Sequence, residues 1–111
     1  MNSMYAKYLK EKTQDQIVET DKGFVTYRYL ADGKTVYIVD IYVLPDWRQT
    51  YAAKAMADNI VEEARKKGCN QLLGSVVPSN KSSTTSVKVL LAYGMNLVSS
   101  GNDLIFFKKD I

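Results

Sequence analysis

The sequence contains no histidine and a single cysteine, Cys69. Without histidine the chain cannot build a Ser-His-Asp triad, a Cys-His pair or a histidine zinc site, and we expect no bound metal. One cysteine cannot form an internal disulfide, which fits a reducing compartment. No apolar run approaches the length of a membrane span, and residues 1–14 lack the apolar segment of a signal peptide. We therefore expect a cytoplasmic protein with no membrane partner.

The composition is that of an ordinary soluble domain. With 111 residues, of which 46% are hydrophobic and 24% charged, the chain suits one domain over 1–111 with a single core. Its 15 Lys and Arg against 12 Asp and Glu give a net charge of +3. Because no dense basic block accompanies this mild excess, the sequence argues against a nucleic acid partner.

The N-terminal part predicts a short helix and three strands. Residues 4–16 can form a helix, and 17–20 a short strand. Residues 23–30 are rich in β-branched and aromatic side chains, as are 35–44, and both segments are expected to be strands. The Asp-Gly pair within 31–34 predicts a hairpin turn between them. The three strands are therefore expected to be antiparallel.

The middle of the chain predicts a strand, a helix and a second strand. The nearly continuous apolar run of 35–44 is typical of a central strand buried on both faces, with Asp40 as its one charge. Apolar residues recur at helical spacing over 50–67, and Gly68 follows as a C-terminal signal. Residues 70–78 then form a further strand. A helical connection of this length predicts that the two strands are parallel.

The C-terminal part predicts a loop over 78–83, a helix over 84–94, and two strands, 96–100 and 104–108, joined by a hairpin. The whole order is a helix, three antiparallel strands, a helix, a strand, a helix and two strands. Such an order indicates an α/β or mixed α+β domain around one twisted sheet.

Three segments in this order carry a resemblance to a known family. They read DIYVLPDWRQTYAAKAM at 40–56, VVPSN at 76–80 and YGMNLVSSGNDLIFFKKD at 93–110. Together they resemble the fourth strand with the acyl-CoA motif, the end of the fifth strand, and the closing Gly-Phe and hairpin of the GNAT family of acyl-CoA-dependent N-acyltransferases. Met95 replaces the usual Phe. The resemblance implies a central twisted mixed sheet flanked by helices, in a single GNAT-like domain with a shortened N-terminal part.

The acyl-CoA motif of that family, R/Q-x-x-G-x-G/A, is matched by Arg48 and Ala53, but Tyr51 stands at the first glycine. A pyrophosphate needs backbone N–H groups, and a helix N-terminus supplies several with a favourable dipole. Glycine would allow close approach or a positive φ; with tyrosine the N–H survives if φ is helical, and the cradle is distorted if it is not. The resemblance implies acetyl-CoA as cosubstrate, held by Val43, Arg48, Gln49, Tyr51, Ala52, Ala53, Lys54 and Asn80.

The resemblance also implies where the chemistry takes place. The N–H of Val43 would polarise the acyl carbonyl, and Asp40 would take a proton from the amine, directly or through water. Alternatively, Asp40 caps or pairs within the sheet. Family members protonate the leaving thiolate from a tyrosine at the position held here by Leu90. We expect Tyr93 to serve packing, and a thiol with a pKa of about 8.5 can leave without an acid.

The leading interpretation is an N-acetyltransferase that moves an acetyl group from acetyl-CoA to an amine by direct attack. The acceptor, a small molecule or a protein, is not readable from the sequence, and its site is either open or completed by the second subunit of a homodimer. The alternative is a catalytically inactive GNAT-like binding or structural/assembly module, which Tyr51 and Leu90 favour. A third interpretation, a nucleic-acid-associated component, requires a clustered basic face and salt-sensitive binding.

Overall fold

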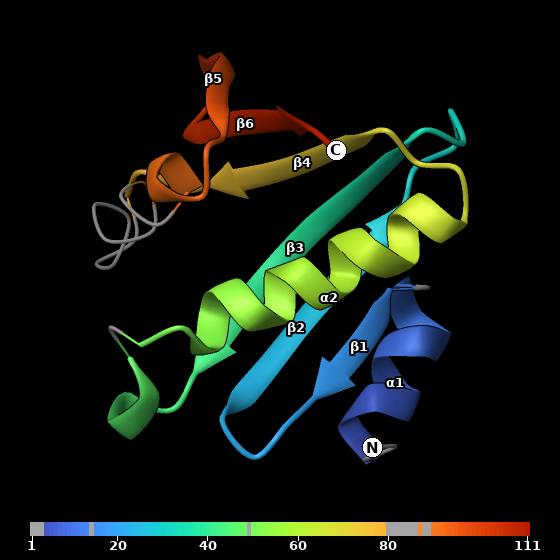
Figure 1. Ribbon diagram of the computed structural model, residues 1–111, viewed down its shortest axis with the longest axis vertical. Coiled ribbons are helices and arrows are strands. Elements are labelled where there is room, and N and C mark those ends of the chain that lie inside the picture. Colours follow the sequence, from blue (N-terminus) through green and yellow to red (C-terminus); the bar gives the residue numbers. More distant parts are fainter. Residues whose placement is uncertain (1–3, 14, 49, 80–86, 88–89) are drawn as a thin grey trace.

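The computed structural model describes residues 4–13, 15–48, 50–79, 87 and 90–111. The elements are helix α1 (Met4–Thr13), strands β1 (Gln16–Glu19), β2 (Gly23–Tyr29) and β3 (Thr35–Val43), the 3-10 turn η1 (Pro45–Trp47), helix α2 (Ala52–Lys66), and strands β4 (Gln71–Val76), β5 (Asn96–Gly101) and β6 (Leu104–Asp110), as drawn in Figure 1. The predicted order is confirmed for these elements. Of the helix expected over 84–94, Val87 and 90–92 are helical, while 84–86, 88 and 89 lie outside the described residues.

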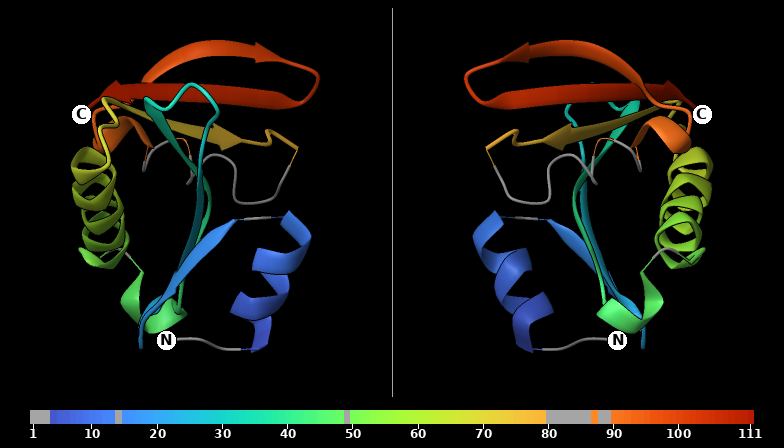
Figure 2. Two further views of the ribbon diagram at one scale, coloured as in Figure 1. Left: turned by 90° about the vertical axis from the view of Figure 1, so that its right-hand side faces the viewer. Right: turned by 90° about the vertical axis from the view of Figure 1, so that its left-hand side faces the viewer.

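One six-stranded mixed sheet organises the molecule. Its strand order is β1-β2-β3-β4-β6-β5. β3 and β4 are parallel, as the connection through α2 predicts, and the other neighbours in the sheet are antiparallel. The side views in Figure 2 show α1 on one face of the sheet and α2 on the other. The expectation of a mixed sheet flanked by helices is confirmed.

The core lies between α2 and the middle of the sheet. Met56, Ile60 and Ala64 follow one another at four-residue spacing on α2, so they share one face of the helix, and all three are buried. That face packs in one cluster with Val36 of β3 and Leu72 of β4, which are 0% and 1% exposed. Full burial of a side chain such as Ile60 contributes about 1.5–3 kcal/mol. The helix is therefore fixed against the two parallel strands.

The expectation that residues 35–44 are buried on both faces is wrong for the second half of the segment. Asp40 is exposed, and Tyr42 and Leu44 are 40% and 42% exposed. The reason is a change of register, because Tyr27 lies opposite Ile38 whereas Thr26 lies opposite Asp40. One residue of β3 is therefore unmatched, which is the pattern of a β-bulge.

Candidate functional site

The parallel strands β3 and β4 separate in the middle of the sheet. β3 and β4 pair from Thr35 opposite Gln71 to Ile38 opposite Gly74. Beyond that point β3 continues to Val43, and within the described residues it has no further partner on the β4 side. Figure 1 shows the two strands diverging from this point. We call the wedge between them the splay.

Backbone N–H groups of β3 face the splay. Leu44 N–H donates to the carbonyl of Lys22 at 2.8 Å, so this position belongs to the hydrogen-bonded set of the β2–β3 ladder. Because such positions alternate in an antiparallel pair, the N–H and C=O groups of Ile41 and Val43 point to the other edge of β3. The carbonyl of Val43 indeed accepts a hydrogen bond from Arg48 Nε at 3.0 Å. The N–H of Val43 thus has the direction that its expected role requires.

The first turn of α2 follows directly from β3 through η1. Tyr51 is the N-cap, with φ −83° and ψ 7°, and its side chain is 82% exposed. The negative φ means that this position does not need glycine, and the exposed ring extends into solvent. The first intrahelical hydrogen bond runs from Ala55 N–H to the Tyr51 carbonyl, so the N–H groups of Ala53 and Lys54 precede the helical ladder. The backbone at Tyr51 therefore has the negative φ under which its N–H group is retained.

Three of the expected cofactor-binding residues are already engaged within the protein. Ala52 N–H donates to Thr50 Oγ1 at 3.1 Å, which removes one donor from the turn. Arg48, besides its bond to β3, lies with its guanidinium carbon 5.7 Å from the centre of the Tyr42 ring. Lys54 forms an ion pair with Asp58 at 2.8 Å, and both side chains are about half exposed. Gln49 and Asn80 lie outside the described residues.

Asp40 lies on the α1 face of the sheet, beside the splay. Its neighbour two residues along β3, Tyr42, stacks on Phe24 at 5.6 Å between ring centres, and Phe24 in turn contacts Tyr5 of α1 at 6.2 Å. Within the described part of the chain the Asp40 carboxylate makes no hydrogen bond or ion pair, so the alternative role as a cap or sheet partner finds no support there. The Asp40 carboxylate is exposed, and none of the described residues blocks its access to a ligand by pairing with it.

Tyr93 packs, as expected, and is committed to α2. Its ring packs against the core cluster, and its hydroxyl donates to Asp58 Oδ1 at 2.6 Å. Burial and the Asp58 carboxylate raise the pKa of Tyr93, while Lys54 and then Tyr93 lower the pKa of Asp58. Leu90 packs against the same core and would lie 3.5 Å from a Cβ placed on Gly74. Neither residue 90 nor residue 93 thus offers a readily transferred proton at the splay.

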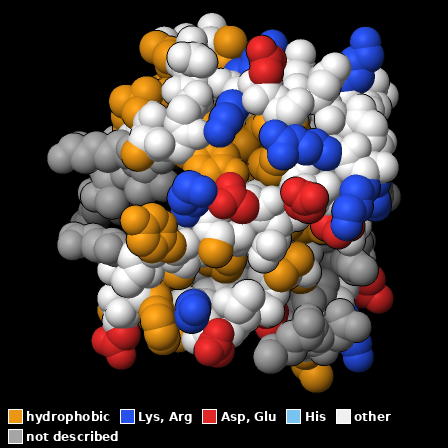
Figure 3. Space-filling view, viewed as in Figure 1, with side chains coloured by type: hydrophobic (Ala, Val, Ile, Leu, Met, Phe, Trp, Pro, Cys, Tyr) orange, Lys and Arg blue, Asp and Glu red, His pale blue; other side chains and the backbone are white. Residues whose placement is uncertain are grey.

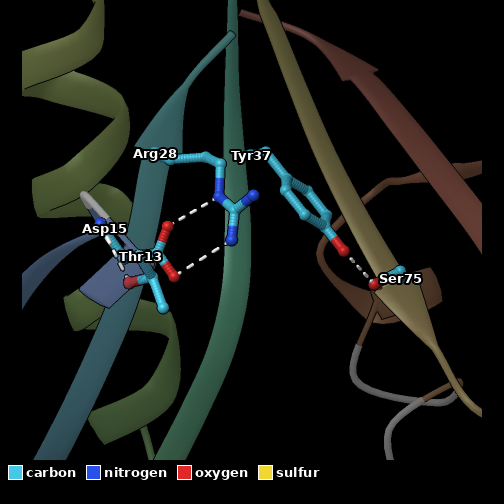
Figure 4. A network of polar contacts seen from close by, with 5 residues as sticks. All are labelled: Thr13, Asp15, Arg28, Tyr37 and Ser75. Atoms are coloured by element: carbon cyan, nitrogen blue, oxygen red, sulfur yellow. Dashed lines mark hydrogen bonds and ion pairs between the residues drawn. The ribbon is translucent and has the colours of Figure 1, made fainter. Parts of the chain in front are cut away.

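A polar network on the α1 face was not predicted from the sequence. Arg28 of β2 meets Asp15, the residue before β1, through Nη2–Oδ2 at 3.1 Å and a close Nε–Oδ1 contact at 2.6 Å. Beside it, the hydroxyl of Tyr37 on β3 lies 2.5 Å from Ser75 Oγ on β4. Figure 4 shows these side chains in one row across three strands. The alternation of Thr26 and Arg28 along β2 places both on one face, but nothing in the sequence pairs Asp15 with Arg28.

A second concave feature lies beside the start of α2. It is an open pocket of about 400 Å³ between η1 and the turn that joins β1 to β2, lined by residues that include Lys22, Trp47, Tyr51 and Asn59. The ammonium of Lys22 sits 4.6 Å from the centre of the Trp47 ring. The α2 side of the molecule, seen in Figure 3, carries Lys, Arg, Asp and Glu intermixed.

The described residues contain neither a membrane-spanning helix nor a metal-binding cluster. None of the helices there is long and apolar enough to cross a membrane. The same residues hold no group of three or more Cys, Asp or Glu side chains placed to bind a metal ion.

This fold, with a splayed parallel pair that leads into a helix N-terminus, is that of an acyl-CoA-dependent N-acyltransferase. The model of the acetyltransferase (GNAT) family matches residues 12–85, and the chain belongs to that family. The resemblance found in the sequence is thereby confirmed.

Proteins similar to this chain are named as acetyltransferases. Mouse (Mus musculus) thialysine N-epsilon-acetyltransferase is 34% identical over 71 residues, which make up 61% of this chain and 42% of that protein. The PaiA N-acetyltransferase of Thermoplasma acidophilum, solved with coenzyme A, superimposes with a TM-score of 0.75 at 13% identity, over 97% of this chain and 69% of its own. A Bacillus subtilis acetyltransferase, also solved with coenzyme A, gives a TM-score of 0.71 at 15% identity, over 95% and 83%. The chain thus spans only about two fifths of the mouse relative.

Proposed function

We propose that the protein transfers an acetyl group from acetyl-CoA to an amine by direct attack. The observation that carries the proposal is the splay, which exposes the N–H edge of β3 and continues through η1 into the first turn of α2. One continuous stretch of backbone therefore offers donors for a thioester at one end and for a pyrophosphate at the other. Family membership and the coenzyme A bound by two of the structural neighbours support this assignment.

Arg48, Ala53, Lys54, Val43 and Tyr51 each take a role in this scheme. The pyrophosphate binds the N–H groups of Ala53 and Lys54, which precede the first hydrogen bond of the helix, with the remaining guanidinium nitrogens of Arg48 beside it. The pantetheine arm runs along the splay, where the N–H of Val43 donates to the thioester oxygen. Tyr51 contributes its backbone N–H only, because its ring faces solvent.

The reaction needs one base and no protein acid. The amine nitrogen forms a bond with the acetyl carbon, the carbon–sulfur bond breaks, and coenzyme A leaves as a thiolate. Asp40 accepts the proton that the nitrogen loses, directly or through a water molecule. The thiolate then takes a proton from solvent, since a thiol has a pKa of about 8.5. This route accommodates Leu90 at the position of the usual tyrosine.

The acceptor is an amine whose class the mouse relative illustrates, because that enzyme is named for the epsilon-amine of thialysine. A catalytically inactive binding module is the second candidate. The specific observation in its favour is the internal engagement of Lys54 and Ala52, which removes a cation and a donor from the first turn of α2.

Calorimetric titration with acetyl-CoA tests the proposal. We expect the native protein to bind, and Arg48→Ala to weaken binding about ten- to a hundredfold, the effect of losing one charge-assisted contact. Arg65→Ala is the matched control, because Arg65 is exposed in the last turn of α2 and should leave the affinity unchanged. Absence of binding to the native protein, with its thermal transition intact, would refute the acyltransferase assignment.

A further inference from the structure

We propose that Arg28 binds an anionic group of the acceptor, so that the acceptor is an amine that also carries a carboxylate. The inference rests on the proposed function and adds the chemical class of the second substrate. The polar row on the α1 face carries it.

Arg28 lies on β2, beside β3 and the splay. On β2 it lies directly opposite Tyr37 of β3, and its guanidinium carbon is 5.9 Å from the centre of the Tyr37 ring. The Tyr37 hydroxyl reaches Ser75, the residue of β4 that follows Gly74, where pairing with β3 stops. The guanidinium therefore stands beside the inner end of the splay, on the face opposite α2 (Figure 4).

The Arg28 side chain is held in place by Asp15. Its partner Asp15 is 4% exposed, and the two side chains meet through two nitrogen–oxygen contacts at 2.6 and 3.1 Å. The backbone N–H of Asp15 in turn donates to Thr13 Oγ1 at 3.2 Å, at the end of α1. A buried carboxylate is costly unless a cation meets it, so this pair fixes the guanidinium in one orientation.

One guanidinium nitrogen of Arg28 does not contact Asp15. Nη2 donates a hydrogen bond to Asp15 and Nε makes a close ion-pair contact with it, while the third nitrogen, Nη1, points away from Asp15 toward Tyr37 (Figure 4). The side chain is 42% exposed, and within the described residues it makes no other hydrogen bond or ion pair. Because the ion pair is neutral as a whole, Nη1 would hold an anion by directed hydrogen bonds more than by net charge. A carboxylate oxygen is the acceptor that suits such a donor.

The carboxylate of Asp40 lies on the same face of the sheet as Arg28. Asp40 stands on the same face, opposite Thr26, which is two residues before Arg28 on β2. The face therefore presents a carboxylate where the amine must lose its proton and a guanidinium donor one strand away. A molecule with a cationic amine and an anionic carboxylate complements this pattern, and a diamine does not.

Matched pairs of acceptors distinguish amines that carry a carboxylate from diamines that do not. Transfer from acetyl-CoA would be measured, by release of the free thiol, to L-lysine against cadaverine and to L-ornithine against putrescine, because each pair differs only by the carboxylate. We expect the native protein to favour the carboxylate-bearing member about ten- to a hundredfold in kcat/KM, the effect of one charge-assisted contact. Arg28→Gln should reduce this preference to less than about threefold while acetyl-CoA affinity, measured by calorimetry, stays unchanged.

A second variant guards against a folding artefact. Since Arg28→Gln leaves Asp15 buried without its cation, the double variant Asp15→Asn with Arg28→Gln restores a neutral, hydrogen-bonding pair at the same place. The preference should be lost in both variants. Equal or faster transfer to the diamines by the native protein, or a preference that survives in the double variant, would overturn the assignment of Arg28.

The remaining outcomes also decide. A protein that binds acetyl-CoA but acetylates neither member of either pair would overturn the acceptor class and leave the cofactor site standing. A protein that does not bind acetyl-CoA would overturn the proposed function, and the role of Arg28 with it.

Discussion

Replacing Tyr51 by glycine restores the residue usual at this point of the acyl-CoA motif, and we expect it to gain nothing. The backbone there already has φ −83°, which any residue adopts, and the ring is 82% exposed. Glycine adds only unfolded-state entropy, so Tyr51→Gly should lower the free energy of unfolding by about 0.5–1 kcal/mol. The dissociation constant for acetyl-CoA should change by less than about threefold, equivalent to about 0.7 kcal/mol.

Urea denaturation gives the first quantity and calorimetric titration the second. Tyr51→Ala is the matched control, because it removes the ring without freeing the backbone and should keep both stability and affinity close to native. A gain in affinity of tenfold or more in Tyr51→Gly alone would show that the turn needs a conformation that tyrosine denies. The same gain in both variants would show that the ring covers the site. Either result would refute the reasoning from φ and exposure.

Two further perturbations test the surroundings of the site. Gly23→Ala would place a Cβ 1.9 Å from the carbonyl oxygen of Tyr42, both groups being backbone-anchored, so thermal denaturation should show a loss of more than about 2 kcal/mol; a smaller loss would contradict the tight β2–β3 approach. Tyr93→Phe removes the hydroxyl bond to Asp58, which is about half exposed, and should cost about 0.5–1 kcal/mol at neutral pH. Because the folded-state pKa of Tyr93 is raised, its contribution is fully present below pH of about 10 and is lost as pH rises through the folded value, so the native protein should lose more stability than Tyr93→Phe in alkaline denaturation curves.

The sequence was sufficient for the elements whose residues repeat at a fixed period. The apolar spacing of α2 and the apolar run of β3 predicted these two elements from local pattern. The helical connection between β3 and β4 then predicted that these two strands are parallel. The fold class followed from that order together with the resemblance to the family. The β5–β6 hairpin was predicted from its local pattern, whereas the pairing of β6 with β4 joins segments distant in the chain, for which a periodic pattern carries no information.

The site residues that were predicted are close together in the sequence, and those that were missed come mostly from separate elements. The candidates within 40–54 came from one motif, so the structure brings Val43, Arg48 and Tyr51 together because they are neighbours in sequence. Arg28 and Asp15 come from separate elements, as do Tyr37 and Ser75, and each pair meets only through the arrangement of the strands. The internal engagement of Lys54 was also missed, although its spacing of four residues from Asp58 is the one local signal that could have revealed it.

The bulge in β3 connects the error about this strand with the chemistry proposed for it. In an uninterrupted strand, Asp40 would share a face with Val36 and Ile38, which pack into the core with α2. The unmatched residue reverses the alternation, so that Ile41 joins the core and Asp40 turns to the α1 face. Pairing with β4 ends at the same place, after Ile38. A single inserted residue thus accounts for an apolar strand that carries an exposed charge on its α1 face, and it lies where the splay begins.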